Sequence, residues 1–115
     1  MREIKFRGRR VDNNEWVYGN FVKPNYIISY FDKDNLLEPE FAEIIPETVG
    51  QYTGLKDING TEIYEGMDAI NKLRKERKGK IVFTKGGFSF DDLEDETCIA
   101  LFYLCYYNIL EVTGE

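Results

Sequence analysis

The sequence contains no histidine and only two cysteines among its 115 residues. The commonest general base of enzymes is therefore missing, and a zinc ion would find only two cysteines, without a CxxC pair, and carboxylates. Two cysteines also do not make the disulfide framework of a small secreted domain. We expect no metal centre and no cofactor. We expect free thiols at Cys98 and Cys105, whose odd spacing in an extended segment would place the two sulfurs on opposite faces.

Long hydrophobic runs are missing as well. No segment approaches the roughly eighteen apolar residues of a membrane span, and Met1 to Ile4 leads straight into patterned sequence without a signal peptide. The length suits one domain, and 43% apolar with 15% aromatic residues is typical of a folded globular chain. These features predict a single domain over residues 1–115 that stays in the cytoplasm.

Short segments of alternating apolar and polar residues predict an all-β protein. In the first half, strands at residues 4–11 and 16–22 form a hairpin around a turn at 12–15, with Trp16, Tyr18 and Phe21 packing on a sheet face. Residues 26–31 form a third strand, followed by a loop that contains Pro39. Residues 41–45 fit either a short strand or one helical turn.

The second half continues in short segments, at residues 68–73, 80–83, 86–90 and 98–107. Ten glycines and frequent turn signals favour a small barrel or packed sheets, with a hairpin-rich region over about 1–50 and a barrel-like region over about 51–115. The apolar run at 99–107 is expected to be a buried strand. The alternative is an exposed edge for self-association through Cys105, Tyr106 and Tyr107, so that a homo-oligomer remains open.

The stretch TGLKDINGTEIYEGMDAI, residues 53–70, is best interpreted as two corners between strands. An EF-hand loop counted from Asp57 would need glycine at its sixth position, whereas here glycine is fourth, and no Gly-Lys-Ser/Thr phosphate loop is present. Asn59 and Gly60 are expected to supply the positive φ angles of a tight hairpin turn, and Gly66 a second corner.

Four acids of this stretch, Asp57, Glu62, Glu65 and Asp68, could converge as an acid and base pair or a magnesium site. Acidic turns on soluble surfaces are far commoner, so we favour solvated charges. No nucleophile has a recognisable partner motif, and we expect no catalytic residues and no enzyme.

The charges are strongly segregated along the chain, although the net charge is only −6. Ten acids lie between Asp32 and Asp68 and five more at residues 91–96. Eleven of the fifteen cations fall into two clusters, within residues 2–10 and 72–80. Segregated charge of this kind steers partners toward a surface.

Two binding functions use this polarity. In the preferred one, the acidic surfaces at residues 32–68 and 91–96 meet a basic host or phage protein, or the basic patch of another copy of the chain. In the alternative, the basic segments 2–10 and 72–80 contact nucleic acid, with Trp16, Tyr18 or Phe88 as stacking faces. The net acidity weighs against the alternative. Its contact residues, equally candidates for a protein partner, are Arg74, Lys75, Arg77, Lys78, Arg7 and Arg9.

Several motifs together resemble the YopX family of small phage and prophage proteins. They are REIKFRG at the start, WVYGN at Trp16, IIPETVGQYTGLKDINGTEIYEG over residues 44–66 and, more weakly, LEVTGE over 110–115. Two features depart from the family: Met67 separates Glu65-Gly66 from Asp68, and the sequence ends at Glu115, short of the usual Asn-Pro-containing tail.

The resemblance implies an all-β fold whose C-terminal half is similar to an SH3-like barrel. It also implies a phage or prophage accessory protein that acts inside a bacterial cell, on host machinery or phage replication. The family offers no catalytic residue to carry over. The interpretation is a non-enzymatic binding protein, with protein interaction preferred and nucleic-acid binding as the alternative.

Overall fold

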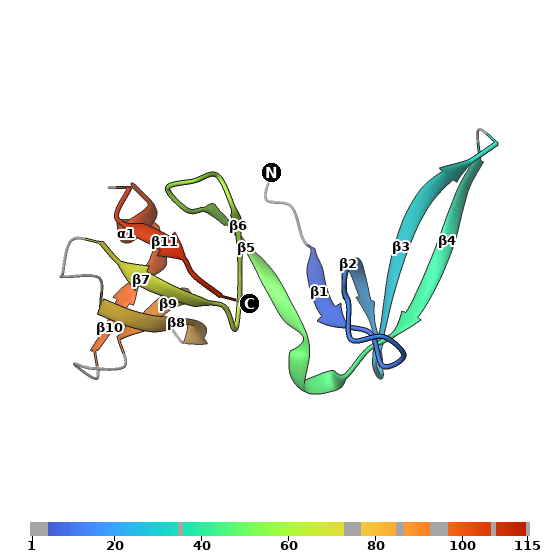
Figure 1. Cartoon of the computed structure of the whole chain (residues 1–115), viewed down its shortest axis with the longest axis horizontal. Coiled ribbons are helices and arrows are strands. Elements are labelled where there is room, and N and C mark those ends of the chain that lie inside the picture. Colours follow the sequence, from blue (N-terminus) through green and yellow to red (C-terminus); the bar gives the residue numbers. More distant parts are fainter. Residues whose placement is uncertain are drawn as a thin grey trace. The chain divides into compact units, whose positions relative to one another are not determined.

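The computed structural model describes residues 5–34, 36–72, 77–84, 87–92, 97–106 and 108–114. The chain divides into two compact units, residues 1–52 and residues 53–115 (Figure 1). Antiparallel strands dominate both units, so the all-β prediction is confirmed.

Unit 1 is a meander of four strands with a fifth added beside the first. Phe6 pairs with Gly19 in the β1–β2 hairpin, and Asn20 pairs with Ile28 between β2 and β3. A one-turn 3-10 helix, Pro46–Thr48, precedes the fifth strand, which gives the spatial order β4-β3-β2-β1-β5. The bounds are β1 Phe6–Arg9, β2 Trp16–Val22, β3 Tyr26–Lys33, β4 Leu36–Glu43 and β5 Gly50–Lys56.

The segment around Pro39 is a strand, so the predicted loop was wrong. Pro39 lies in the middle of β4, opposite Tyr30 of β3. Proline is tolerated there because β4 is the last strand of the sheet, where a missing N–H breaks no ladder bond. Figure 1 shows β3 and β4 as a long hairpin that extends beyond β1 and β2 within this unit.

The apolar core of unit 1 is small and lies at the base of this hairpin. Ile27, Ala42 and Ile44 are buried. Gly8 of β1 packs so closely on Ile44 that a Cβ there would lie 2.8 Å from its Cδ1 atom. The distal half of the hairpin, by contrast, has almost no buried side chain.

Unit 2 begins within β5, whose second half pairs with β6 (Glu62–Tyr64) around the Asn59-Gly60 turn. A five-stranded sheet follows in the order β10-β9-β8-β7-β11, in which the last strand returns beside the first. Ile63, Tyr64, Ile81, Phe90 and Leu110 are the largest members of its core. The bounds are β7 Asp68–Asn71, β8 Arg77–Thr84, β9 Gly87–Asp92, β10 Thr97–Ala100 and β11 Leu110–Val112.

The sequence left a small barrel or packed sheets open, and over the described residues neither sheet closes on itself. One sequence expectation for unit 2 was wrong. The run expected to be one buried strand is divided between β10 and a helix, α1 (Leu101–Tyr106). Leu101 and Leu104, three residues apart, face the core, while Phe102 and Tyr106 are 67% and 68% exposed. Because the run contains no polar residues, its sequence does not show whether buried positions recur with the period of a strand or of a helix.

Candidate interaction surface

Two of the predicted contact residues, Arg7 and Arg9, lie on β1 beside Trp16. Their guanidinium carbons lie 3.7 and 4.6 Å from the centre of the Trp16 ring, within the range of cation–π attraction. Arg7 is only 3% exposed, and Arg9 also donates to the carbonyl oxygen of Asn14 at 2.6 Å. This cluster has a packing role, and Trp16 is already covered by cations.

Arg10, next on the chain, is held by two acids. It donates to both carboxylate oxygens of Asp12 at 2.9 Å and to Glu40 of β4 at 3.2 Å. The hydrogen bond from Arg10 holds the pKa of Asp12 below its usual value. The basic segment at residues 2–10 is therefore partly neutralised where the structure describes it.

The second basic segment is similarly engaged. Arg74 and Lys75 lie outside the described residues. The Nε atom of Arg77 lies 3.7 Å from the fully buried carboxylate of Asp92, and Lys80 pairs with Asp68 at 3.1 Å. Lys78 is exposed on β8 and lines a pocket of about 350 Å³ that includes Asp68. The described part of this second basic segment therefore offers few cations without a neighbouring acid.

The aromatic side chains predicted to stack on nucleic-acid bases differ in their exposure. Phe88 packs edge-to-face on Phe83, with ring centres 4.9 Å apart. Tyr18 remains 45% exposed on β2. Of the three aromatics chosen from the sequence, Tyr18 has the most exposed side chain.

The corner at Asn59 and Gly60 is a turn organised by Asp57, for which the sequence favoured a solvated surface charge. Asp57 is 8% exposed, and its Oδ1 atom accepts from the backbone N–H groups of Asn59 and Thr61, both at 2.9 Å. Of the two predicted turn residues only Gly60 has a positive φ, +81°. Gly66, with φ of +95°, forms the second corner as expected.

The four acids of this stretch do not converge. Asp57 serves the turn, Glu62 accepts from the hydroxyl of Tyr64 at 3.1 Å, and Asp68 pairs with Lys80. Over the residues that the structure describes, no group of three or more acids or cysteines is placed to hold a metal ion. These carboxylates have separate structural roles.

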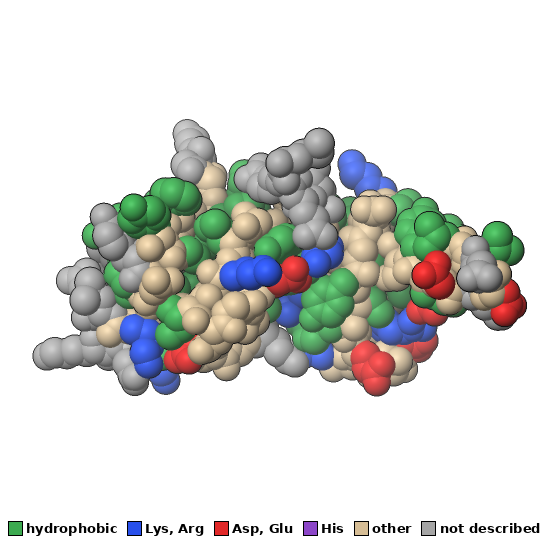
Figure 2. Space-filling model, turned by 90° about the horizontal axis from the view of Figure 1, so that it is seen from above, with side chains coloured by type: hydrophobic (Ala, Val, Ile, Leu, Met, Phe, Trp, Pro, Cys, Tyr) green, Lys and Arg blue, Asp and Glu red, His purple; other side chains and the backbone are tan. Residues whose placement is uncertain are grey.

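The largest exposed apolar surface of unit 1 is the distal β3–β4 hairpin, which the sequence analysis missed. Figure 2 shows hydrophobic side chains gathered over this hairpin beside acidic ones. Pro39 suggested a loop, so no strand was predicted for β4. Leu37 and Phe41 nevertheless lie two residues before and after Pro39, as apolar residues on one face of a strand do. The exposed side chains are Tyr30 (58%), Phe31 (44%), Leu36 (65%), Leu37 (71%) and Phe41 (61%).

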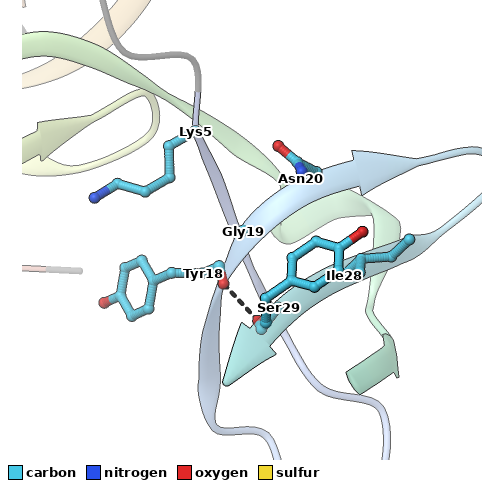
Figure 3. Close-up of a pocket in the computed structure, with 7 residues that line it drawn as sticks. Lys5, Tyr18, Gly19, Asn20, Ile28 and Ser29 are labelled. Carbon is cyan, nitrogen blue, oxygen red and sulfur yellow. Dashed lines mark hydrogen bonds between the residues drawn. The ribbon is translucent and has the colours of Figure 1, made fainter. Parts of the chain in front are cut away.

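A hollow of about 230 Å³ lies at the base of this hairpin (Figure 3). Gly19 is among its lining residues and lies so close to β3 that a Cβ there would be 2.2 Å from the carbonyl oxygen of Ile28. The ring of Tyr18 lies on one side, near the Lys5 side chain, and the hydroxyl of Ser29 donates to the Tyr18 carbonyl at 2.6 Å. Tyr30 and Asn20 complete the lining.

The model of the YopX protein family matches residues 5–115 of this chain. The chain belongs to the YopX family. A solved structure, the crystal structure of protein EF1440 from Enterococcus faecalis, is similar with a TM-score of 0.59 and 21% identity, covering 100% of this chain and 94% of that chain. That likeness shows a shared fold. A search of curated proteins finds no match.

A second exposed surface of this YopX-family chain lies on α1. The rings of Phe102 and Tyr106 stack with centres 6.1 Å apart, and Tyr103 is 51% exposed beside them. Cys105 is a half-buried free thiol, and burial together with the nearby charge of Asp57 raises its pKa to about 11. Tyr107 lies outside the described residues, as does the Cys98 side chain.

No helix among the described residues is long and apolar enough to cross a membrane.

Proposed function

We propose that this YopX-family chain is a phage or prophage accessory protein that acts in the bacterial cytoplasm as a non-enzymatic protein-interaction module. The β3–β4 hairpin is its contact surface. One observation carries the proposal: five large apolar side chains are 44–71% exposed on a single hairpin. Three of them, Tyr30, Leu37 and Phe41, share one face of the hairpin. An exposed apolar patch of this kind marks an interaction site, because leaving it in water costs free energy that a partner recovers.

The charges around the hairpin support a basic protein as partner. Residues 26–43 contain five acids and one lysine. Acidic surroundings raise the encounter rate with a basic protein and disfavour the pairing of two identical hairpins. The same charges repel phosphates, and several basic residues once considered for nucleic acid lie next to carboxylates. Protein interaction is therefore favoured over nucleic-acid binding.

The SH3-like description of unit 2 belongs to the same proposal. It is supported by the strand order, in which β11 returns beside β7 after the meander β7-β8-β9-β10.

The test is an affinity capture of the tagged full chain from bacterial lysate, with and without nuclease, followed by mass spectrometry. We expect specific proteins to be retained after nuclease by the unmodified chain and lost by a Tyr30→Ser, Phe41→Ser double variant. Tyr106→Ser is the matched control, because it makes the same change at an equally exposed tyrosine of unit 2.

Two results would contradict the proposal. Proteins retained equally by the double variant would place the contact elsewhere. Recovery of material that nuclease removes entirely, and that Lys78→Glu weakens, would favour nucleic acid instead.

A further inference from the structure

The hollow at Gly19 and three of the exposed apolar side chains of the hairpin, Tyr30, Leu37 and Phe41, lie on one face of the unit 1 sheet. Residues that pair directly across antiparallel strands share a face, and alternate residues of a strand do as well. Asn20 pairs with Ile28, Ile28 with Phe41, and Tyr30 with Pro39. This face, opposite the side of buried Ile27 and Ala42, is named the tyrosine face. On β3 and β4 its members are Tyr26, Ile28, Tyr30, Asp32, Leu37, Pro39, Phe41 and Glu43, and on β2 and β1 they are Trp16, Tyr18, Asn20, Val22, Arg7 and Arg9.

The free edge of β4 is poorly suited to accept a partner strand. The N–H of Ile44 donates to the carbonyl of Asn25, on the β3 side, whereas the carbonyl of Glu43 accepts from the N–H of Val11, on the side away from β3. Backbone groups of neighbouring residues therefore point to opposite sides of the strand. By that alternation the backbone groups of Phe41, Pro39 and Leu37 point away from β3. Pro39 has no N–H to offer there, which interrupts the row of donors that strand addition needs. A partner is therefore better placed on the face than at the edge.

The tyrosine face has the chemistry that an extended, proline-containing peptide requires. Such a peptide forms no internal hydrogen bonds, and it docks between aromatic ridges that contact its rings. Tyr18 and Tyr30 line the hollow and are 45% and 58% exposed. The amide of Asn20 and the hydroxyl of Tyr30 are exposed donors for peptide carbonyls.

The charges at the two ends of this face select the flanking residues of the ligand. Asp32 pairs with Leu37 at the distal end, and Glu43 pairs with Tyr26 at the other, so both acids share the face with Tyr30. Lys5 is the one cation among the residues that line the hollow. Arg7 and Arg9 of β1 share the face, but both lie over the Trp16 ring, and Arg7 is buried. A ligand that carries Lys or Arg beside its prolines complements this arrangement, whereas a phosphate backbone would meet the acids.

We propose that the tyrosine face binds an extended peptide segment that contains proline and is flanked by lysine or arginine. This inference rests on the proposed function and names the chemistry of its partner. The face contributes aromatic contact and side-chain hydrogen bonds, and Asp32 and Glu43 contribute attraction to the flanking cations.

The experiment is a selection from a random-peptide library on the immobilised full chain, with the Tyr30→Ser variant as counter-selection. Affinities of the selected peptides are then measured, with an oligothymidylate as a separate ligand. We expect proline with Lys or Arg to be enriched. We expect Tyr30→Ser to weaken binding about tenfold or more, as for a central aromatic contact, while Tyr106→Ser has no effect. Asp32→Asn is expected to weaken binding about threefold and to reduce its salt dependence.

The outcomes separate this inference from the proposed function. Tyr30-dependent peptides without proline or basic residues overturn the inference and leave a protein-interaction module standing. Tyr30-dependent binding of oligothymidylate with an affinity equal to that of the peptides also overturns it, in favour of nucleic acid. A library that yields no Tyr30-dependent peptide overturns it as well, and the lysate capture then decides the proposed function independently.

Discussion

The Oδ2 atom of Asp57 accepts a hydrogen bond from the backbone N–H of Val112 at 2.9 Å. The same carboxylate holds the Asn59-Gly60 turn through its Oδ1 atom. One buried side chain therefore links the turn between β5 and β6 to β11, close to the other end of unit 2 in sequence. The turn is a structural centre of this unit.

Replacing this carboxylate should destabilise the protein. Asp57→Ala removes three acceptor interactions and leaves backbone donors without a partner, so we expect the free energy of unfolding to fall by about 2 to 4 kcal/mol. Urea unfolding measures the change. Glu65→Ala, at a half-buried acid of the next corner, is the control and should change stability by less than about 0.5 kcal/mol. Equal stability of Asp57→Ala and the unmodified chain would contradict this role.

The turn itself tests a purely conformational effect. Gly60 has a φ of +81°, and a Cβ there would have no heavy atom within 4 Å. Gly60→Val should therefore cost about 1 to 3 kcal/mol through backbone strain alone. Gly60→Asn should cost less, because asparagine tolerates this region of φ. If both variants unfold at the same urea concentration as the unmodified chain, the turn is not strained.

Gly79 in β8 tests the opposite situation, in which space is the limit. A Cβ on Gly79 would lie 2.4 Å from Cζ of Phe90 and 2.6 Å from the carbonyl oxygen of Asp91. Phe90 is fully buried, so its ring cannot move aside into solvent. We expect Gly79→Ala to lower stability by about 1 to 3 kcal/mol in urea unfolding, as overpacking does. A stabilised Gly79→Ala variant would contradict the close packing between β8 and β9.

The all-β class and both corners could be predicted because their signals are local. Alternation identified β1, β2 and β3, and isolated glycines marked the turns at Gly60 and Gly66. The interaction surface could not be found in this way. Whether Pro39 ends a strand or sits on a sheet edge depends on which strand has only one neighbour, and that is a property of the whole sheet.

The contact residues chosen from charge illustrate the same limit. The sequence shows that Arg7 and Arg77 are basic, but only the fold brings Trp16 and Asp92 beside them. The helix α1 was missed because a run of apolar residues satisfies the period of a strand and that of a helix equally.

The thiol of Cys105 provides a pH-dependent test. Burial raises its pKa from 9.0 to about 11, so the folded protein favours the protonated thiol. The resulting stabilisation is complete below about pH 9 and is lost as pH rises through about 11. Site-resolved alkylation followed by mass spectrometry should show slow reaction of Cys105 at neutral pH, with a steep increase toward pH 11. Rapid alkylation of the folded protein at pH 7 would contradict a shielded thiol.

The central claim is that the β3–β4 hairpin contacts a protein. The most direct measurement replaces Tyr30 with a photoreactive phenylalanine analogue and irradiates bacterial cells that produce the full chain. The same replacement at Tyr106 is the control, since both tyrosines are exposed. The account predicts a discrete protein adduct from position 30 that position 106 does not give. Adducts with nucleic acid at position 30, or no adduct there at all, would contradict it.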